Sequence, residues 1–321
     1  MLDKLLAVLA DGAFHSGSAL GKSLGMSRSA VWKHMRRLEE LGVEVYSVKG
    51  RGYRIPGGLD LLQQQEIGQA LAPLEHLHEI EVRTEVDSTN LIALDRLQRG
   101  ISRGLYVAEY QHGGRGRRGR QWLSPLASSL CFTLAWRFNS GAAALEGLSL
   151  AVGIALQRAL QRMGIPGTAL KWPNDVLVND AKLAGILIEL SGDAAGECQV
   201  AVGVGLNVAV PDALLEQLDQ SATDLRRLGY AGTRTELLTE LVTELVGVLD
   251  LFERGGFAPL RPEWEAANAF AGRSVRLTSG RHSFEGVCLG VTDQGGLRLQ
   301  TDAGEEVFHG GEMSVRVHEP A

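Results

Sequence analysis

The hydrophobic pattern of the first 55 residues predicts three short helices followed by two strands. Leucines recur at helical intervals over residues 2–9, and residues 18–23 form a second helical stretch. Ser27 is then placed to cap the N-terminus of a third helix. Val43–Val48 and Gly52–Ile55 alternate polar and apolar residues as two strands do. This order is typical of a winged helix-turn-helix.

The third helix has two chemically different faces. Val31, Met35 and Leu38 share the face that would be buried. The opposite face is polar and cationic, and it carries Arg28, Ser29, Trp32, Lys33 and Arg36. A solvated basic face would explain this pattern, but the hairpin that follows also has cations at its tip, which favours entry of the helix into a DNA major groove. The candidate DNA-binding residues are Ser27, Arg28, Ser29, Lys33, Arg36, Lys49 and Arg51.

A second and larger domain is expected after the helix-breaking run Pro56-Gly57-Gly58. Some of its apolar segments show the two-residue repeat of strands or are continuously apolar, and others show the 3.6-residue repeat of helices. The strands are expected at Leu77–Thr84, Leu105–Tyr110, Ser129–Trp136, Lys182–Leu190 and Val200–Val208, and at Leu170–Val178, where a turn at Pro173 and Asn174 interrupts the strand. The helices are expected at Leu91–Arg99, Ala144–Met163 and Thr233–Phe252. Pro262–Phe270 is interpreted as a connector, and Gly272–Val317 as short strands between glycines.

Composition narrows the class of protein. The chain has 321 residues, 45% of them hydrophobic, which is enough for two or three domains with their own cores. It contains no run of roughly 18 uncharged apolar residues and no opening signal peptide, so we expect a cytoplasmic protein without a membrane partner. Cys131, Cys198 and Cys288 are odd in number, far apart and without metal-ligand spacing, which favours free core thiols over a disulfide or a zinc site, and we assign no residue as a metal ligand.

The net charge of −6 hides an asymmetry between the two ends of the chain. Residues 1–58 carry nine Lys and Arg against five acids, so the remainder carries −10. A basic N-terminal segment on an acidic protein agrees with the DNA-binding interpretation of the helices.

The densest chemistry lies in the run Gly113–Trp122, which holds four arginines and four glycines. Guanidinium forks and uncovered backbone N–H groups are suited to an anion such as phosphate or carboxylate, although a solvated basic loop is the plain alternative. The spacing of Gly114, Gly116 and Gly119 also matches a dinucleotide-binding fingerprint. We reject that match because no amphipathic helix follows and no acidic residue stands about 20 positions further on.

Other candidate residues are ambiguous when taken singly. Ser88, Thr89 and Asn90 could cap a helix or line a polar pocket. Gly203 and Gly205 strip the side chains from one face of a strand, either for close packing or for a flat ligand.

Four motifs in order resemble those of the biotin–protein ligase family. They are Gly114–Arg120, Lys171–Asp175, Lys182–Ile186 and Gly203–Asn207. Together with the N-terminal winged helix-turn-helix, they resemble the bifunctional ligase and biotin-operon repressor of Gram-negative bacteria. The resemblance implies an α+β multidomain protein with a winged helix-turn-helix over 1–60, a class II synthetase-like ligase domain with a central mixed β-sheet over 66–269, and an SH3-like β-barrel over 270–321.

The resemblance also assigns roles to residues. It implies that Arg117 and Lys182 are catalytic. The biotin-binding positions it implies are Ser88, Thr89, Asn90, Gln111, Arg115, Gly116, Arg117, Lys182, Gly185, Gly203 and Gly205. The nucleotide-binding positions are Arg118, Arg120, Asn174, Asn207 and Arg316. The segment 217–227 occupies the place of the family's adenylate-binding loop, yet it has no aromatic residue to cover an adenine.

The implied function has two parts. ATP, Mg²⁺ and biotin would give biotinyl-5′-AMP, whose biotin passes to a lysine of the biotin carboxyl carrier protein of acetyl-CoA carboxylase. The adenylate would also favour a homodimer that binds operator DNA and represses biotin synthesis. Two alternatives stay open, a ligand-sensing regulator that has lost catalysis and a pocket that takes lipoate or octanoate.

Overall fold

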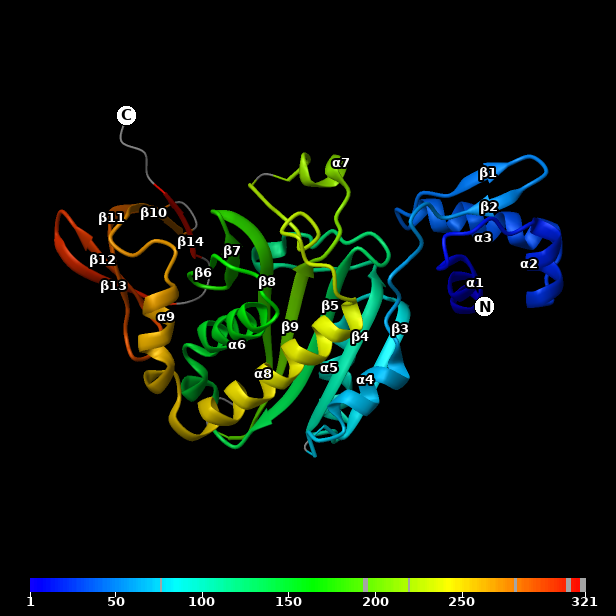
Figure 1. Cartoon of the computed structure of the whole chain (residues 1–321). Coiled ribbons are helices and arrows are strands. Elements are labelled where there is room, and N and C mark those ends of the chain that lie inside the picture. The colour runs from blue at the N-terminus through cyan, green and yellow to red at the C-terminus, as the bar shows by residue number, and fades with distance from the viewer. Residues whose placement is uncertain (76, 193–195, 219, 280–281, 310–312, 318–321) are drawn as a thin grey trace.

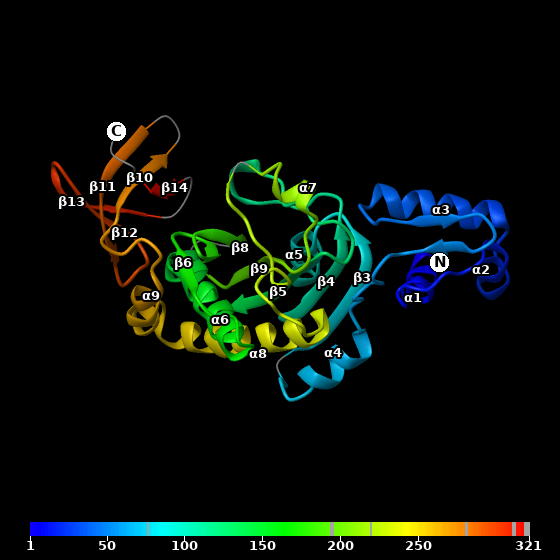
Figure 2. The ribbon, with the colours of Figure 1, turned by 45° about the horizontal axis from the view of Figure 1, so that its top comes forward.

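The protein consists of three structural parts arranged in a row (Figure 1). A small helical part lies at the N-terminal end, a large sheet covered by helices lies in the middle, and a small sheet lies at the C-terminal end (Figure 2). The computed structural model describes the chain except residues 76, 193–195, 219, 280–281, 310–312 and 318–321, and it describes only the backbone of 192, 279 and 313–317.

The N-terminal part has the predicted order of elements. Its helices are α1 (Leu2–Leu9), α2 (Gly17–Leu24) and α3 (Arg28–Glu40), and its hairpin is β1 (Tyr46–Val48) with β2 (Gly52–Arg54). The Ser27 hydroxyl accepts a hydrogen bond from Ala30 N, which satisfies one of the unpaired N–H groups at the start of α3. Val31, Met35 and Leu38 are at most 3% exposed, as the predicted inner face requires.

The first wing strand is shorter than predicted. It begins at Tyr46 instead of Val43, because Val43 is buried in the helical core and its N–H bonds to Leu38 O just after α3. The apolar side chains of Val43 and Val45 therefore reflect packing against the helices and not pairing in the hairpin.

The middle part is built on a mixed sheet of seven strands in the order β3-β4-β5-β9-β8-β7-β6. β3 and β4 run parallel, and every other neighbouring pair is antiparallel. The strands are β3 (Glu79–Val86), β4 (Arg103–Gln111), β5 (Ser129–Phe138), β6 (Thr168–Lys171), β7 (Asp175–Val178), β8 (Ala181–Gly192) and β9 (Cys198–Asn207). The predicted runs Leu105–Tyr110, Ser129–Trp136 and Val200–Val208 become interior strands that are buried on both faces, whereas Leu77–Thr84 overlaps the edge strand β3.

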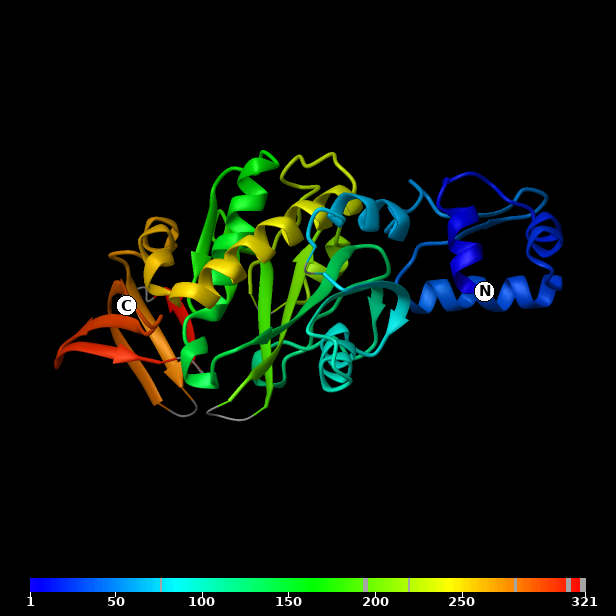
Figure 3. The ribbon, with the colours of Figure 1, turned by 90° about the horizontal axis from the view of Figure 1, so that it is seen from below.

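Helices cover the two faces of the sheet unequally. The larger core lies under α4 (Gln64–Leu71), α6 (Leu148–Arg162) and α8 (Arg234–Gly255), and Figure 3 shows α8 crossing the strands. On the other face, α5 (Thr89–Gln98) buries Ala93 and Leu97 against Tyr106, Ala135 and Ala201. The remaining helical segments of this part are the turns at Arg117–Gly119 and Ala142–Leu145 and the short α7 (Asp212–Leu215).

One helical segment, Ala142–Arg162, is long and apolar enough to cross a membrane by length and composition alone. Within it, 67% of the most apolar window is buried, and α6 packs against α8 and β6. Its apolar surface is therefore accounted for by the protein core.

The C-terminal part is a five-stranded antiparallel sheet in the order β13-β12-β11-β10-β14. Its strands are β10 (Ser274–Ser279), β11 (His282–Val291), β12 (Leu297–Thr301), β13 (Gly304–Phe308) and β14 (Met313–Val317). The prediction of a connector at Pro262–Phe270 was wrong, because a turn at Ala258–Leu260 leads into the helix α9 (Arg261–Ala267). Pro262 stands in the first turn of α9, where a missing N–H costs nothing, so it starts the helix instead of breaking it.

The N-terminal and middle parts share a hydrophobic core. Leu126 and Ala127, which follow the arginine-rich loop, pack with the leucines of α1 and α3. Leu126 N donates to Leu41 O over 3.0 Å, and Arg37 of α3 pairs with Glu85 of β3 over 2.7 Å. The segment after the loop is thus part of the core of the helix-turn-helix.

Candidate functional site

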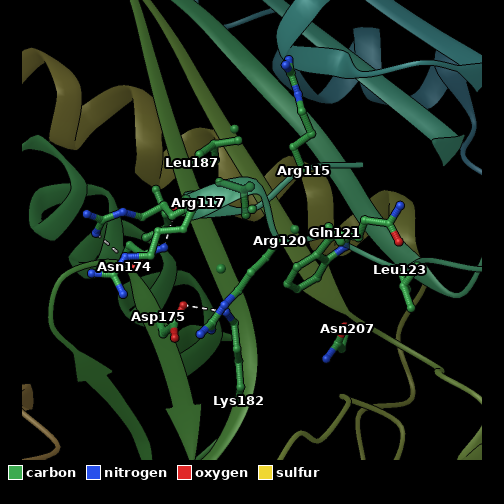
Figure 4. Close-up of a pocket in the computed structure, with 18 of the residues that line it drawn as sticks. Arg115, Arg117, Arg120, Gln121, Leu123, Asn174, Asp175, Lys182, Leu187 and Asn207 are labelled. Atoms are coloured by element: carbon green, nitrogen blue, oxygen red, sulfur yellow. Dashed lines mark hydrogen bonds and ion pairs between the residues drawn. The ribbon is translucent and has the colours of Figure 1, made fainter. Parts of the chain in front are cut away.

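A cavity of about 170 Å³ lies where the arginine-rich loop crosses the ends of β8 and β9 (Figure 4). It collects side chains from the loop, from the start of α5 and from the β6–β7 hairpin, together with those of Leu218, Gln220 and Ala222. Fifteen residues predicted as site residues line it, namely Ser88, Thr89, Asn90, Gln111, Arg115, Gly116, Arg117, Arg118, Arg120, Asn174, Lys182, Gly185, Gly203, Gly205 and Asn207. The structure therefore brings together residues that are up to 119 positions apart in the chain.

Uncharged polar groups form one wall of the cavity. The Thr89 N–H and hydroxyl donate to Gln111 Oε1 over 2.8 and 3.2 Å. The Thr133 hydroxyl lies 2.8 Å from Thr89 Oγ1 and 2.6 Å from Asn90 Oδ1. Ser88 occupies the N-cap position of α5 but makes no side-chain cap bond. The side chains of Ser88, Thr89 and Asn90 therefore act as a pocket wall, and the Ser88 side chain does not cap the helix.

Glu189 was missed by sequence reasoning, although it organises this wall. Asn90 Nδ2 donates to Glu189 Oε2 over 2.7 Å, and Arg115 Nη2 lies 3.5 Å from Glu189 Oε1. One carboxylate therefore fixes the Asn90 amide and holds the first arginine of the loop. The available signal was a single acid inside the apolar run Lys182–Leu190.

Glycines form a flat floor beneath the cavity. Gly185 of β8 stands opposite Gly205 of β9 in the sheet. A Cβ on Gly203 would lie 2.2 Å from Asn90 Oδ1, and one on Gly205 would lie 2.4 Å from Trp122 Cε2. The glycines are needed because the Asn90 amide and the Trp122 ring approach the bare backbone closely. Trp122 was another residue that sequence reasoning did not assign to the site.

The opposite end of the cavity is strongly cationic. Besides Arg115, which Glu189 holds at the polar wall, the described lining residues include five cations, Arg117, Arg118, Arg120, Lys171 and Lys182, against the single carboxylate of Asp175. Lys182 Nζ lies 2.7 Å from Asp175 Oδ1, and Lys171 Nζ lies 4.0 Å from Asp175 Oδ2. One carboxylate cannot neutralise this group of cations, so the cavity favours an anionic ligand.

Arg117 points into this cationic region and contacts Asn174 (Figure 4). Its Nη1 donates to Asn174 Oδ1 over 3.4 Å. Burial, together with the neighbouring Arg118, lowers the pKa of the Arg117 guanidinium from its ordinary value. A desolvated guanidinium interacts more strongly with a bound anion than a solvated one does.

The arginine-rich loop folds back on itself. Gly116 N bonds to Arg120 O over 2.7 Å, and Trp122 N bonds to Gly114 O over 2.9 Å. Arg118 has a positive φ of 60°, and its Nη2 donates to Thr278 O of β10 over 3.0 Å. The loop thus lines the cavity in the middle part and also contacts the C-terminal sheet.

The segment that follows α7 closes the remaining side. Lys182 N bonds to Ser221 O and Thr223 N to Lys182 O, each over 2.9 Å. Asn207 Nδ2 donates to Thr223 O over 3.0 Å. Leu218, Gln220 and Ala222 face the cavity, so aliphatic and amide groups stand where the sequence lacks an aromatic side chain, while Asp219 lies outside the described residues.

Arg316 is a predicted site residue of which the structure describes only the backbone. Its backbone belongs to β14, where it pairs with Arg276 of β10. The Arg316 side chain lies outside the described residues.

The predicted DNA-binding residues form an exposed cationic surface. Ser27, Arg28, Ser29, Lys33 and Arg36 are all exposed on α3, and Lys49 and Arg51 are exposed at the tip of the hairpin. The Arg51 guanidinium stacks over the Phe14 ring at 4.1 Å from its centroid, which restricts the orientation of that cation.

The arrangement of the cavity defines what it can bind. A flat floor and an uncharged wall of hydrogen-bonding groups suit a compact polar ring, and the cationic end suits carboxylate and phosphate. Cations that surround two reacting anions lower the barrier to their reaction by positioning and by neutralising charge.

Comparisons with known proteins agree in all three parts of the chain. Residues 82–207 match the model of the biotin/lipoate A/B protein ligase family, residues 2–54 match an HTH domain, and residues 270–316 match the biotin protein ligase C-terminal domain. The chain is 40% identical over 313 residues to the bifunctional ligase/repressor BirA of Escherichia coli K12, covering 98% of this chain and 96% of that protein. It is 38% identical over 235 residues to the biotin–[acetyl-CoA-carboxylase] ligase of Paracoccus denitrificans, covering 71% of this chain and 96% of that protein. Among solved structures, the biotin protein ligase of Aquifex aeolicus in complex with biotin and ATP superimposes with a TM-score of 0.64 at 29% identity, over 75% of this chain and all of that one.

Proposed function

Because the chain belongs to the family of bifunctional biotin–protein ligases and repressors, we propose that it makes biotinyl-5′-AMP from biotin and ATP and transfers the biotin to a carrier protein. We also propose that the adenylate-bound form represses biotin synthesis genes. The biotin carboxyl carrier protein of acetyl-CoA carboxylase and operator DNA are the corresponding partners, in the cytoplasm.

The observation that carries the ligase function is the combination of five cations at one end and an uncharged polar wall in one cavity. In the first step a biotin carboxylate oxygen bonds to the α-phosphorus of ATP, and pyrophosphate leaves. In the second step a carrier lysine nitrogen bonds to the acyl carbon, and AMP leaves with the electron pair of the broken C–O bond. Both reactants of the first step are anions, so Lys182 and Arg117 are proposed to act by charge neutralisation and positioning.

Biotin is proposed to lie over the glycine floor. Its ureido ring has both donors and acceptors, which the side chains of Ser88, Thr89, Asn90 and Gln111 can satisfy. Gly203 and Gly205 let the Asn90 amide and the Trp122 ring lie close to the sheet, so that the fused rings would lie over these two side chains and beside Gly185. Arg115, Gly116 and Arg117 would close over the rings. The carboxylate end of the ligand would then reach Lys182.

The nucleotide is proposed to lie at the cationic end. Arg118, Arg120, Asn174, Asn207 and Arg316 are its proposed contacts, and Leu218, Gln220 and Ala222 are proposed to cover the adenine. Asn174 and Asp175 offer side-chain oxygens of the kind that Mg²⁺ prefers, so they would hold the ion that accompanies the triphosphate. When bound, Mg²⁺ would neutralise phosphate charge in the same region.

The domain architecture follows the same family. We assign residues 1–60 to a winged helix-turn-helix, 66–269 to a class II synthetase-like ligase domain, and 270–321 to an SH3-like barrel. The distinct hydrophobic clusters around the N-terminal helices and around the seven-stranded sheet, together with the five antiparallel strands of the C-terminal part, support this division.

The ligase proposal is tested by trapping the intermediate. The protein is mixed with Mg²⁺, α-labelled ATP and either biotin or lipoate, and the label that stays bound through gel filtration is counted. We expect retention with biotin and only background with lipoate, because the polar wall has no partner in an aliphatic acid. Equal retention with lipoate would reassign the substrate, and no retention with either acid would favour a regulator without catalysis.

The repressor proposal predicts that DNA binding depends on the adenylate. The segment after the arginine-rich loop packs in the core of the helix-turn-helix, so ordering the loop on a ligand can bias the DNA-binding part. We propose that the adenylate also favours a homodimer, which would contact two half-sites.

Binding to the operator should therefore require biotin and ATP together. The binding curve should rise more steeply with protein concentration than it does for a monomer. Titrations of labelled operator with each ligand alone, with both and with neither provide the measurement. Equal affinity in all four conditions would contradict the proposed linkage.

A further inference from the structure

Trp32 lies exposed in the middle of the DNA-facing surface of α3. We infer that its indole ring contacts a thymine methyl group in the major groove, so that Trp32 helps to set which DNA sequence is read. This inference rests on the proposed repressor function and adds a specificity residue to the cationic contacts described above.

The exposure of Trp32 is unusual within this protein. Its relative exposure is 55%, whereas Trp136, Trp172 and Trp264 are at most 2% exposed. Within the described part of the chain, no aromatic ring stacks on the Trp32 indole and no cation lies over it. A large apolar ring left in water gains free energy when a partner covers it.

The position of Trp32 on α3 identifies the partner. Arg28 precedes it by one helical turn and Arg36 follows it by one turn, so the three side chains share a face. The inner face of α3, with Val31 and Met35, is buried in the helical core. An apolar ring between two cations suits an anionic surface with an apolar feature at its centre, which describes a DNA groove better than it describes a hydrophobic protein surface.

The chemistry of the ring narrows the contact to one type of base. The edges of base pairs in the major groove present hydrogen-bonding groups and one apolar group, the C5 methyl of thymine. Indole offers one N–H donor and a large apolar surface. Arg28, Lys33 and Arg36 can contact phosphates or guanine, so the methyl group is the feature that Trp32 adds to recognition.

The test uses the full chain loaded with biotin and ATP. Preferred DNA is first selected from a pool of random duplexes by the wild-type protein. Each conserved thymine of the selected site is then replaced with uracil, which removes only the methyl group. For wild type we expect one such replacement per half-site to weaken binding by about three- to tenfold. For Trp32→Ala the same replacement should change affinity by less than twofold.

Lys33→Ala serves as the matched control on the same helix. It should weaken binding to thymine and uracil sites equally and reduce the slope of log affinity against log salt by about one. Trp32→Ala should leave that slope unchanged, and its thermal unfolding midpoint should match wild type because the ring is exposed. If replacing thymine with uracil weakened binding equally in wild type and Trp32→Ala, the proposed contact of Trp32 would be overturned, while the repressor function would still stand. Failure of the wild type to select any DNA would overturn the repressor function, and this inference with it.

Discussion

Replacing Lys182 with methionine is expected to lower the rate of adenylate formation by about 10²–10³-fold, the usual cost of losing one group that stabilises charge in a transition state. The Lys182 side chain is 17% exposed, so its ammonium acts where water screens it poorly. Its Nζ lies 2.7 Å from Asp175 Oδ1, which fixes the charge at the cationic end of the cavity (Figure 4). Methionine keeps the length of the aliphatic chain and removes only the charge and the donors.

Single-turnover release of pyrophosphate from biotin and MgATP provides the measurement, with biotin affinity determined separately. Lys182→Arg is the control, because it retains the charge in a different shape and should recover part of the rate. A second control, Lys22→Met, removes an exposed lysine of α2 and should have no effect. A Lys182→Met rate close to wild type would show that the reacting carboxylate and phosphate meet elsewhere in the cavity.

Local periodicity predicted most of the fold because each element buries a regular face. Ser27 and the triad Val31, Met35 and Leu38 specify both the start of α3 and its inner side, and the structure agrees with both. The connector at Pro262–Phe270 was wrong for a local reason, because proline is equally compatible with a break and with the first turn of a helix. The order of the seven strands could not be read from the sequence, since it depends on contacts such as β5 with β9 that join distant segments.

The candidate site was predictable where its chemistry is concentrated in the sequence. Four arginines in ten residues and alternate glycines in one strand are visible as patterns, and all of them reach the cavity. Glu189 and Trp122 were missed because their roles arise only in three dimensions. An acid in an apolar strand has no assigned partner until Asn90 and Arg115 are brought to it. A tryptophan after a loop gives no sign that it will lie on Gly205.

A buried ion pair outside the cavity was also invisible in the sequence. Arg234 at the start of α8 is 0% exposed, and its Nη1 lies 2.5 Å from Glu109 Oε2 on β4. The Arg234 guanidinium also donates to Ser129 O over 2.6 Å and to Asp60 O over 2.9 Å. Glu109 Oε1 accepts from Leu62 N over 2.7 Å. The pair thus ties the segment between the helix-turn-helix and the sheet to the centre of the protein.

Removing one partner of this pair is expected to be strongly destabilising. Arg234→Met leaves the Glu109 carboxylate buried without its cation, which costs about 3–5 kcal/mol of unfolding free energy. In a protein of this size that loss lowers the unfolding midpoint by roughly 4–8 °C. Differential scanning calorimetry of the two proteins under identical conditions provides the measurement.

The exposed pair of Arg99 and Asp95 supplies the control. Its atoms lie 2.9 Å apart with side chains 66% and 47% exposed, so Arg99→Met should cost at most about 1 kcal/mol. The double variant Glu109→Leu with Arg234→Met removes both charges and should be more stable than Arg234→Met alone, since no unpaired buried charge remains. It should still fall short of wild type, because Leu62 N loses its acceptor. If Arg234→Met and Arg99→Met unfolded at the same temperature, the buried carboxylate would have found another cation or water, and the anchoring of the segment around Asp60 and Leu62 would not depend on this pair.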